Sequence, residues 1–287
     1  MSLVYLNGEF LPVERACVPV MDRGFLFGDG VYEVFPSFGG RLFRLSQHLE
    51  RLNDSLRAIR IDPPHSLQEW EEILIRLILP WSRTDLSIYL QVTRGVASKR
   101  DHTIPPCITP TVFVMATPIP PGNAESNARG VAAITREDFR WGRCDIKAIT
   151  LLANVLLRQE AADQGALEAI LIRNGLATEG AASNLFMVQD GTLITPPKGP
   201  HLLPGITRDL VLELAAAQGI PHMIANIPVT DLARAEEIWL TSSVREIMPV
   251  IRLNGVPVGV GIPGPHWQRI NQLYQGFKAD MRGERGR

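Results

Sequence analysis

A stretch without helical or strand periodicity near the middle of the chain constrains the fold most. Residues 117–130 read Thr-Pro-Ile-Pro-Pro-Gly-Asn-Ala-Glu-Ser-Asn-Ala-Arg-Gly, which combines three prolines with small polar residues. Proline lacks the amide hydrogen that helices and central strands need, so this composition is typical of a connection between domains. We therefore expect an N-terminal domain over 1–117, a linker over 118–130 and a C-terminal domain over 131–287.

Helix and strand patterns alternate before this linker. Asn7-Gly8 and Gly39-Gly40 separate short apolar runs and predict hairpin turns. Ser46 is expected to cap a helix, and Ser66 with Glu69 forms a capping box for a second helix that reaches Leu79. Two segments pattern as strands, residues 86–92 by strict alternation of apolar residues and residues 111–116. The first domain is therefore predicted to be α+β.

The C-terminal part also mixes both kinds of element, and it has no internal repeat. A helix is expected after residue 147, another after Gly205, and a third at the end of the chain. Strands and hairpin turns are expected at 169–172, 174–175, 190–191, 240–241 and 254–255.

The overall charge excludes several classes of partner. The 287 residues carry a net charge of −1, with 45% hydrophobic and 21% charged residues and no long run of either sign. Neither nucleic acid nor a membrane is an expected partner. The first ten residues lack the pattern of a secretory signal, and Cys17, Cys107 and Cys144 are scattered and odd in number, so we expect a cytoplasmic protein without a zinc site. Cys144 is interpreted as a packing residue.

Lys147 is placed where a reactive amine would be useful. The chain has only four lysines, at 99, 147, 198 and 278, and Lys147 precedes a segment whose apolar residues at 151, 152, 155 and 156 recur at helical spacing. We expect it at a helix entrance among apolar neighbours, where desolvation favours the uncharged amine that covalent catalysis needs. On placement alone, a solvated surface lysine remains the alternative.

Two segments offer donors for an anion. Gly205-Ile206-Thr207 opens a predicted helix, where free amides and a hydroxyl bind anions well. Thr241-Ser242-Ser243 follows a predicted strand, and Arg51 supplies a forked cation. Taken singly, Thr207 also suits a plain helix cap, Arg51 a solvated helix residue, and the serines an ordinary loop.

Glu179 is the one carboxylate in an otherwise small and apolar segment, Ala177-Thr-Glu-Gly-Ala-Ala-Ser-Asn184. A carboxylate beside a protonated ring nitrogen keeps both groups charged. Lys147, an anion cup and this carboxylate are together what a pyridoxal phosphate site requires. A turn glutamate facing water is the alternative.

Spaced motifs over nearly the whole chain carry a resemblance to a known family. They are Asp22–Glu33, His48–Arg51, Lys147, Thr178–Gly180, Leu203–Arg208 and Glu246–Val250. With them the chain resembles a fold-type IV pyridoxal phosphate aminotransferase, the family of branched-chain aminotransferases, D-amino acid aminotransferases and aminodeoxychorismate lyases. The resemblance implies an α+β fold with a small N-terminal α/β sandwich domain, a larger C-terminal pseudo-barrel domain carrying the lysine, an active site between the domains, and a homodimer.

The resemblance also implies roles for individual residues. Lys147 is implied as the Schiff-base and proton-transfer lysine, and Glu179 as the partner of the pyridine nitrogen. The residues implied around the phosphate are Arg51, Ile206, Thr207, Ser242 and Ser243.

Within the family, the segment Arg100-Asp-His102 resembles the pair that holds the substrate α-carboxylate in D-amino acid aminotransferases, together with a tyrosine matching Tyr32. In those enzymes this loop comes from the other subunit. The chain departs from the pattern at two places: residues 93–100 are one residue longer than expected, and Ala181-Ala182 stand where hydroxyl residues are often found. Outside the family context, His102 suits an exposed loop.

The prediction is therefore a cytoplasmic D-amino acid aminotransferase that acts on amino acid and 2-oxo acid substrates such as D-alanine and 2-oxoglutarate. A branched-chain L-amino acid aminotransferase and an aminodeoxychorismate lyase are the nearest alternatives. A non-catalytic protein that only binds pyridoxal phosphate is the alternative from another class.

Overall fold

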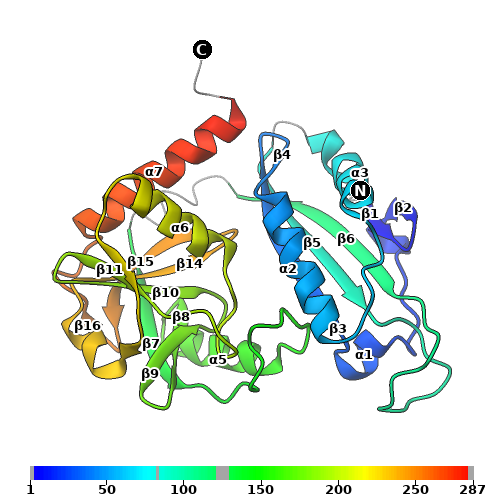
Figure 1. Ribbon diagram of the computed structural model, residues 1–287, viewed down its shortest axis with the longest axis horizontal. Helices are drawn as coiled ribbons and strands as arrows, with labels where there is room; N and C mark the ends of the chain where they lie inside the picture. The colour runs from blue at the N-terminus through cyan, green and yellow to red at the C-terminus, as the bar shows by residue number, and fades with distance from the viewer. Residues whose placement is uncertain (1–2, 82–83, 121–128, 284–287) are drawn as a thin grey trace. The chain divides into compact units, whose positions relative to one another are not determined.

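The computed structural model describes residues 3–81, 84–120 and 129–283, and the chain divides into two compact units (Figure 1). Unit 1 comprises Met1–Ile119, Ile146–Leu151 and Met281–Arg287. Unit 2 comprises Pro120–Asp145 and Leu152–Asp280.

Unit 1 is an antiparallel sheet with helices on one face. Its strands in the described residues are β1 (Leu3–Leu6), β2 (Glu9–Pro12), β3 (Gly30–Phe38), β4 (Arg41–Leu42), β5 (Leu86–Thr93) and β6 (Thr111–Pro118), in the order β2-β1-β6-β5-β3-β4. Its helices are α1 (Arg23–Phe27), α2 (Leu45–Ala58) and α3 (Leu67–Ile78), with short 3-10 turns η1 (Val13–Arg15) and η2 (Leu79–Trp81). Alternate residues of β5 are buried against apolar residues of α2 and α3, as the period of two predicts.

The helix starts of unit 1 show one correct and one wrong prediction. Ser66 and Glu69 form the expected capping box of α3, each side chain bonded to the backbone of the other. Ser46 does not cap α2. That helix begins at Leu45, and Arg44 before it is in the left-handed conformation with φ 46°, because the chain turns sharply out of the short strand β4.

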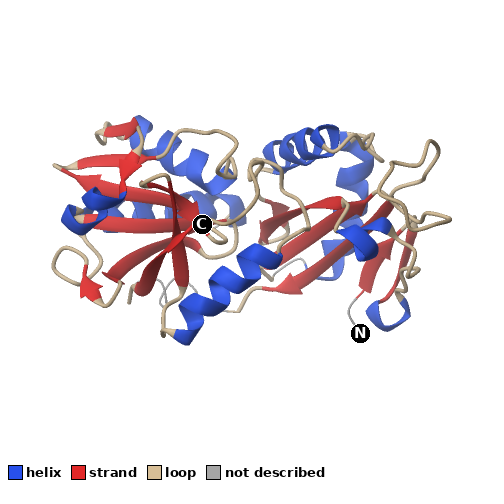
Figure 2. Ribbon diagram, turned by 90° about the horizontal axis from the view of Figure 1, so that it is seen from below, coloured by secondary structure: helices blue, strands red, loops and turns tan. Residues whose placement is uncertain are grey.

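Unit 2 is built on a sheet that closes on itself. Its strands are β7 (Val131–Glu137), β8 (Glu168–Arg173), β9 (Leu176–Gly180), β10 (Asn184–Gln189), β11 (Thr192–Thr195), β12 (His222–Ile224), β13 (Ile227–Pro228), β14 (Glu237–Ser242), β15 (Glu246–Leu253) and β16 (Val256–Pro257). The order β10-β14-β15-β7-β8-β9 becomes a ring because β9 also pairs with β10, through Glu179 and Asn184. Figure 2 shows these strands curving round a shared interior.

Among the described residues, three helices pack on this barrel: α5 (Leu152–Asp163), α6 (Ile206–Ala217) and α7 (Pro265–Arg282), the last ending in unit 1. The segment η3 (Val229–Arg234) is a 3-10 helix. The apolar residues at 151, 152, 155 and 156, whose helical spacing suggested a buried helix after Lys147, do not form a buried face. Leu152, Val155 and Leu156 are exposed, whereas Leu157 and Ala161 on the opposite side of α5 pack against β7 and β8. Among the residues described, none of the helices combines the length and apolar character needed to cross a bilayer.

The segment that carries Lys147 packs with unit 1, whereas the sequence placed it in the C-terminal domain. Ala148 forms a β-bridge with Val31 of β3, and the Ile149 amide donates to the Gly30 carbonyl at 3.1 Å. These backbone bonds explain why residues 146–151 belong to unit 1 although they lie beyond the expected linker. Of that linker, residues 121–128 lie outside the described part of the chain.

The buried carboxylate of Glu237 anchors the start of α7. It accepts hydrogen bonds from the amides of His266 and Trp267 at 2.9 and 2.8 Å, and from the Trp239 indole at 2.9 Å. The first amides of a helix have no partner within the helix, and a negative charge there is favourable. Glu237 therefore fixes the last helix to strand β14.

Replacing Glu237 with alanine should lower the stability of the protein by about 3 kcal/mol, because it removes a charged acceptor and leaves buried donors unsatisfied. Thermal or urea unfolding measures this change. Glu236→Ala, at the neighbouring exposed position, is the control and should change stability by less than about 0.5 kcal/mol. Equal effects of the two substitutions would contradict the anchoring role.

Candidate functional site

Lys147 is held by its backbone between β3 and α2. Its amide donates to the Ser55 hydroxyl at 3.2 Å, and its carbonyl accepts from the Tyr32 amide at 2.9 Å. The side-chain nitrogen lies 4.2 Å from the centre of the Tyr32 ring, and Tyr32 stacks on Tyr89 with ring centres 5.7 Å apart. The structure thus brings together two residues that the sequence analysis singled out, Lys147 and Tyr32, and it fixes the backbone of the lysine on both sides.

Arg51 belongs to a buried polar cluster in the same unit. Its Nε and Nη2 donate to the two carboxylate oxygens of Glu33, both at 2.8 Å, and His48 Nδ1 lies 2.8 Å from Glu33 Oε2. Burial alone would raise the pKa of Glu33, but Arg51 and His48 outweigh it and hold that pKa at about 2. Burial lowers the pKa of His48. Arg51 is therefore fixed by a paired carboxylate and is not the solvated helix residue that was the alternative.

Arg100 and His102 both lie close to the Phe27 ring. The Arg100 guanidinium is 4.9 Å from the centre of the Phe27 ring, and the His102 ring is 5.2 Å from it. Arg23, which is buried, donates to the carbonyl of Asp101 at 2.6 Å and to that of His102 at 3.4 Å. The sequence prediction that Arg100 and His102 act together is consistent with this shared platform, although both side chains are exposed.

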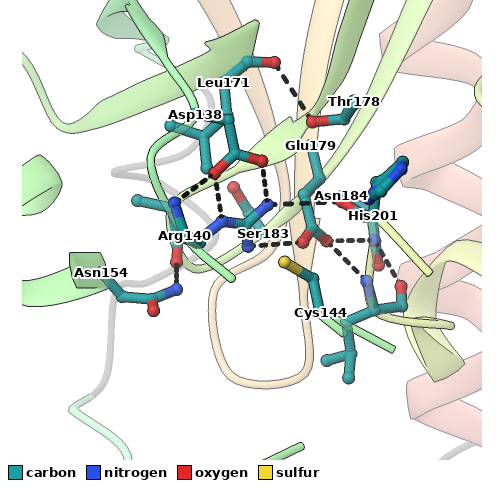
Figure 3. Close-up of polar contacts among 12 residues, drawn as sticks. Asp138, Arg140, Cys144, Asn154, Leu171, Thr178, Glu179, Ser183, Asn184 and His201 are labelled. Atoms are coloured by element: carbon teal, nitrogen blue, oxygen red, sulfur yellow. Dashed lines mark hydrogen bonds and ion pairs between the residues drawn. The ribbon is translucent and has the colours of Figure 1, made fainter. Parts of the chain in front are cut away.

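Glu179 lies in a buried network in unit 2 (Figure 3). Its Oε1 accepts from Arg140 Nη1 at 2.7 Å, and its Oε2 accepts from the Leu203 amide at 2.9 Å and from Asn184 Nδ2 at 3.2 Å. Arg140 also makes hydrogen bonds to both oxygens of Asp138, at 2.9 and 3.0 Å. Glu179 is therefore not a turn glutamate facing water. Donors hold its carboxylate in one orientation.

Burial dominates the protonation of Glu179. Desolvation raises its pKa to about 7, against the lowering effects of the Arg140 guanidinium and the Leu203 amide. Asp138 weakens the effect of Arg140 because its own negative charge raises the pKa of Glu179. The carboxylate is consequently poised near neutral pH, where a cationic partner would ionise it fully.

Unit 2 also contains buried hydroxyl groups close to the start of α6. Ile206 and Thr207 form its first turn after Gly205, and the Thr207 and Thr241 hydroxyl oxygens are buried without a hydrogen-bond partner in the described residues. Thr241 pairs with Asn184 across the sheet. Free helix amides and unsatisfied hydroxyls are the donors that a phosphate group accepts.

The two serines at the end of strand β14 are Ser242, its last residue, and Ser243 in the turn that follows. The Ser242 hydroxyl accepts from the Arg245 amide at 3.3 Å, so it closes the turn between β14 and β15. Ser243 is partly exposed in the same turn. Cys144 is buried, with its thiol directed at the Trp141 carbonyl, which agrees with a packing residue.

Comparison with known proteins identifies the family. The family model described as amino-transferase class IV matches residues 30–253. The chain belongs to the class IV aminotransferases. D-alanine aminotransferases of Listeria monocytogenes and Bacillus licheniformis are each 39% identical to it over 272 residues, covering 94% and 95% of both chains respectively.

Solved structures agree with the family assignment. A branched-chain amino acid aminotransferase from Escherichia coli superimposes with a TM-score of 0.88 at 29% identity, over 96% of this chain and 94% of that one. A hypothetical aminotransferase from Mycobacterium tuberculosis in its PLP-bound form gives a TM-score of 0.83 at 25% identity, over 99% of this chain and 100% of that one. The predicted α+β fold-type IV architecture and the predicted pyridoxal phosphate-dependent transaminase are thereby confirmed.

The side chains of this class IV aminotransferase fit pyridoxal phosphate. The cofactor needs an amine for its aldehyde, a carboxylate for its ring nitrogen, and donors for its phosphate. Within unit 2, Glu179 is a carboxylate suited to the ring nitrogen, and the first turn of α6 with the unsatisfied Thr207 and Thr241 hydroxyls offers donors suited to the phosphate; in unit 1, Lys147 is an amine suited to the aldehyde.

Several residues that complete these clusters could not be found from one sequence. Arg140 and Glu179 are separated by 39 positions, and nothing in the Arg140 segment signals that its guanidinium is buried. Glu33 and His48 lie inside the motifs Asp22–Glu33 and His48–Arg51, but nothing in the sequence indicates that they pair with each other and with Arg51. Asn184 ends the segment that carries Glu179, and nothing there indicates their hydrogen bond.

The pH dependence of stability tests the state of Glu179. Since its pKa is raised above the unfolded value, from 4.5 to about 7, its stabilising effect is full below about pH 4.5 and is lost as the pH rises through 7. Urea unfolding of the cofactor-free protein between about pH 4.5 and 8 should show a decline about 3 kcal/mol larger than in the Glu179→Gln variant. Glu236→Gln, at an exposed position, should follow the unmutated curve. Parallel curves for the unmutated protein and Glu179→Gln would contradict the raised pKa.

Proposed function

We propose that this class IV aminotransferase is a D-amino acid aminotransferase that exchanges the amino group between D-alanine and 2-oxoglutarate. The observation that carries the proposal is the pair Arg100 and His102 on the Phe27 ring, within a chain 37–39% identical to D-alanine aminotransferases. The branched-chain L-amino acid aminotransferases remain the second candidate, because their solved structures superimpose closely.

Pyridoxal phosphate, when bound, supplies an aldehyde carbon and an electron-withdrawing ring. Lys147 would hold the cofactor through its side-chain nitrogen, and its free amine would move the substrate α-proton. Glu179, oriented by Arg140 and the Leu203 amide, would hold a proton on the ring nitrogen.

The remaining predicted site residues are assigned to binding. Arg51, Ile206, Thr207, Ser242 and Ser243 are proposed to hold the phosphate. Thr207 is supported by its unsatisfied buried hydroxyl and Ile206 by its place in the first turn of α6. Arg51 is supported by the ion pair with Glu33, which holds the guanidinium in a fixed orientation.

We assign substrate binding to the guanidinium of Arg100, the ring of His102 and the hydroxyl of Tyr32. Arg100 and His102 are proposed to hold the α-carboxylate together with Tyr32, and gripping one side of the substrate would orient the α-hydrogen for Lys147. Because the side chains of Arg100 and His102 are exposed, we propose that the loop carrying them acts in the site of a second subunit.

A homodimer is supported by large apolar side chains on the surface. In unit 2 they include Phe139, Trp141, Leu152, Val155 and Leu156, with exposed fractions of 49–73%. Exposed apolar side chains of this size favour association over solvation. We also propose a cytoplasmic location, which suits the free Cys17, Cys107 and Cys144.

Replacing Arg100 with alanine should raise the KM for D-alanine and D-glutamate roughly 10- to 100-fold, which corresponds to the 1.5–3 kcal/mol of a hydrogen bond to a charged group. The absorbance of the bound cofactor should stay unchanged, since no proposed cofactor contact is removed. Lys99→Ala is the matched control, because it removes a neighbouring exposed cation that pairs with Asp101. Unaltered D-substrate kinetics in Arg100→Ala would contradict the assigned role.

A further inference from the structure

Asn184 occupies the position where the barrel of unit 2 closes. It is the first residue of β10, and its backbone pairs with Glu179 of β9 on one side and with Thr241 of β14 on the other. Within the described residues, β9 and β10 pair through Glu179 and Asn184. Asn184 therefore lies between the strand that carries the carboxylate and the strand that leads to the serine turn.

The side-chain amide of Asn184 is buried, and hydrogen bonds fix its orientation. Its Nδ2 donates to Glu179 Oε2 at 3.2 Å and to the Leu203 carbonyl at 2.8 Å. The Leu203 amide in turn donates to the same Glu179 oxygen at 2.9 Å. Both neighbours of Nδ2 are acceptors, so the opposite amide orientation would place an oxygen against two oxygens. The Nδ2 atom of Asn184 is thus bonded both to the Glu179 carboxylate and to Leu203, in the segment before α6.

The oxygen end of the same amide faces Gly205. A Cβ atom on Gly205 would lie 1.7 Å from Asn184 Oδ1 and 2.9 Å from its Cγ. The backbone angles of Gly205, φ −73° and ψ 131°, are ones that any residue adopts. Space, rather than backbone conformation, therefore calls for glycine here: α6 begins directly against the Asn184 amide.

From these contacts we infer that Asn184 is a positioning residue that joins the ring-nitrogen end of the cofactor site to its phosphate end. The nitrogen of one planar amide donates to the Glu179 carboxylate, and its oxygen lies against the start of α6. The spacing between the carboxylate and the phosphate donors of α6 then depends on a single side chain. This inference rests on the proposed use of Glu179 and of the α6 amides for one cofactor.

Three variants of the full-length protein test this role: Asn184→Ala, Gly205→Ala and the two combined. The dissociation constant of pyridoxal phosphate should rise about tenfold or more in each single variant, because a hydrogen bond to a charged group is lost or the amide is displaced. In the Asn184→Ala background, Gly205→Ala should cause little further loss, since the nearest remaining atom would be the Arg208 Cβ at 3.4 Å, an ordinary contact. This non-additivity is the expected signature of a shared contact.

A second readout separates positioning from general stability. The ¹⁵N chemical shift of ring-labelled pyridoxal phosphate in the resting enzyme reports protonation of the ring nitrogen, and Asn184→Ala should move it towards the neutral form. Val188→Ala is the control, since Val188 is buried in the same strand and pairs with Glu237 instead. It should lower the melting temperature of the cofactor-free protein and leave both cofactor readouts unchanged.

The inference is overturned if Asn184→Ala matches Val188→Ala in cofactor affinity and ring-nitrogen shift, or if the effects of Asn184→Ala and Gly205→Ala simply add. Failure of the proposed function looks different, because the unmutated protein itself would then fail to bind pyridoxal phosphate or to transfer amino groups.

Discussion

The structure of unit 2 depends on keeping one carboxylate, Glu179, buried in a fixed orientation. A buried carboxylate is costly unless it is paired and hydrogen-bonded. Arg140 donates to Oε1 of Glu179, and the Leu203 amide and Asn184 donate to Oε2. These bonds offset the cost of burial. These partners come from three separate parts of the chain, so the barrel must close for the carboxylate to be satisfied. Closure of the barrel therefore also orients the Glu179 carboxylate.

Unit 1 follows the same principle with different residues. Glu33 is buried with Arg51 and His48 around it, and Arg23 ties Asp29 to the carbonyls of Asp101 and His102. In both clusters an arginine donates hydrogen bonds to acceptors that the fold holds in place. A guanidinium pre-oriented in this way loses less entropy when it binds a ligand.

Turn chemistry and periodicity could be read directly from the sequence. The Asn7-Gly8 hairpin, the Ser66 capping box and the alternation in β5 all rest on neighbouring residues, and all are present. The start of α2 and the exposed side of α5 were predicted wrongly, because the first depends on the preceding strand and the second on which face meets the barrel. Arg140 could not be assigned, since its partner Glu179 is distant in sequence. The motifs around Lys147 and Glu179 carry the family resemblance, and both lie within residues 30–253, which the family model matches.

The central claim is that this class IV aminotransferase acts on D-amino acids. The most direct measurement is an incubation of the purified protein, pyridoxal phosphate and 2-oxoglutarate with racemic alanine, glutamate, leucine and valine, followed by chiral analysis of what remains, with Lys147→Ala as the blank. The account predicts loss of D-alanine first, with the L-enantiomers left intact and D-glutamate formed. Faster consumption of L-leucine or L-valine than of any D-amino acid would contradict it and establish the branched-chain activity instead.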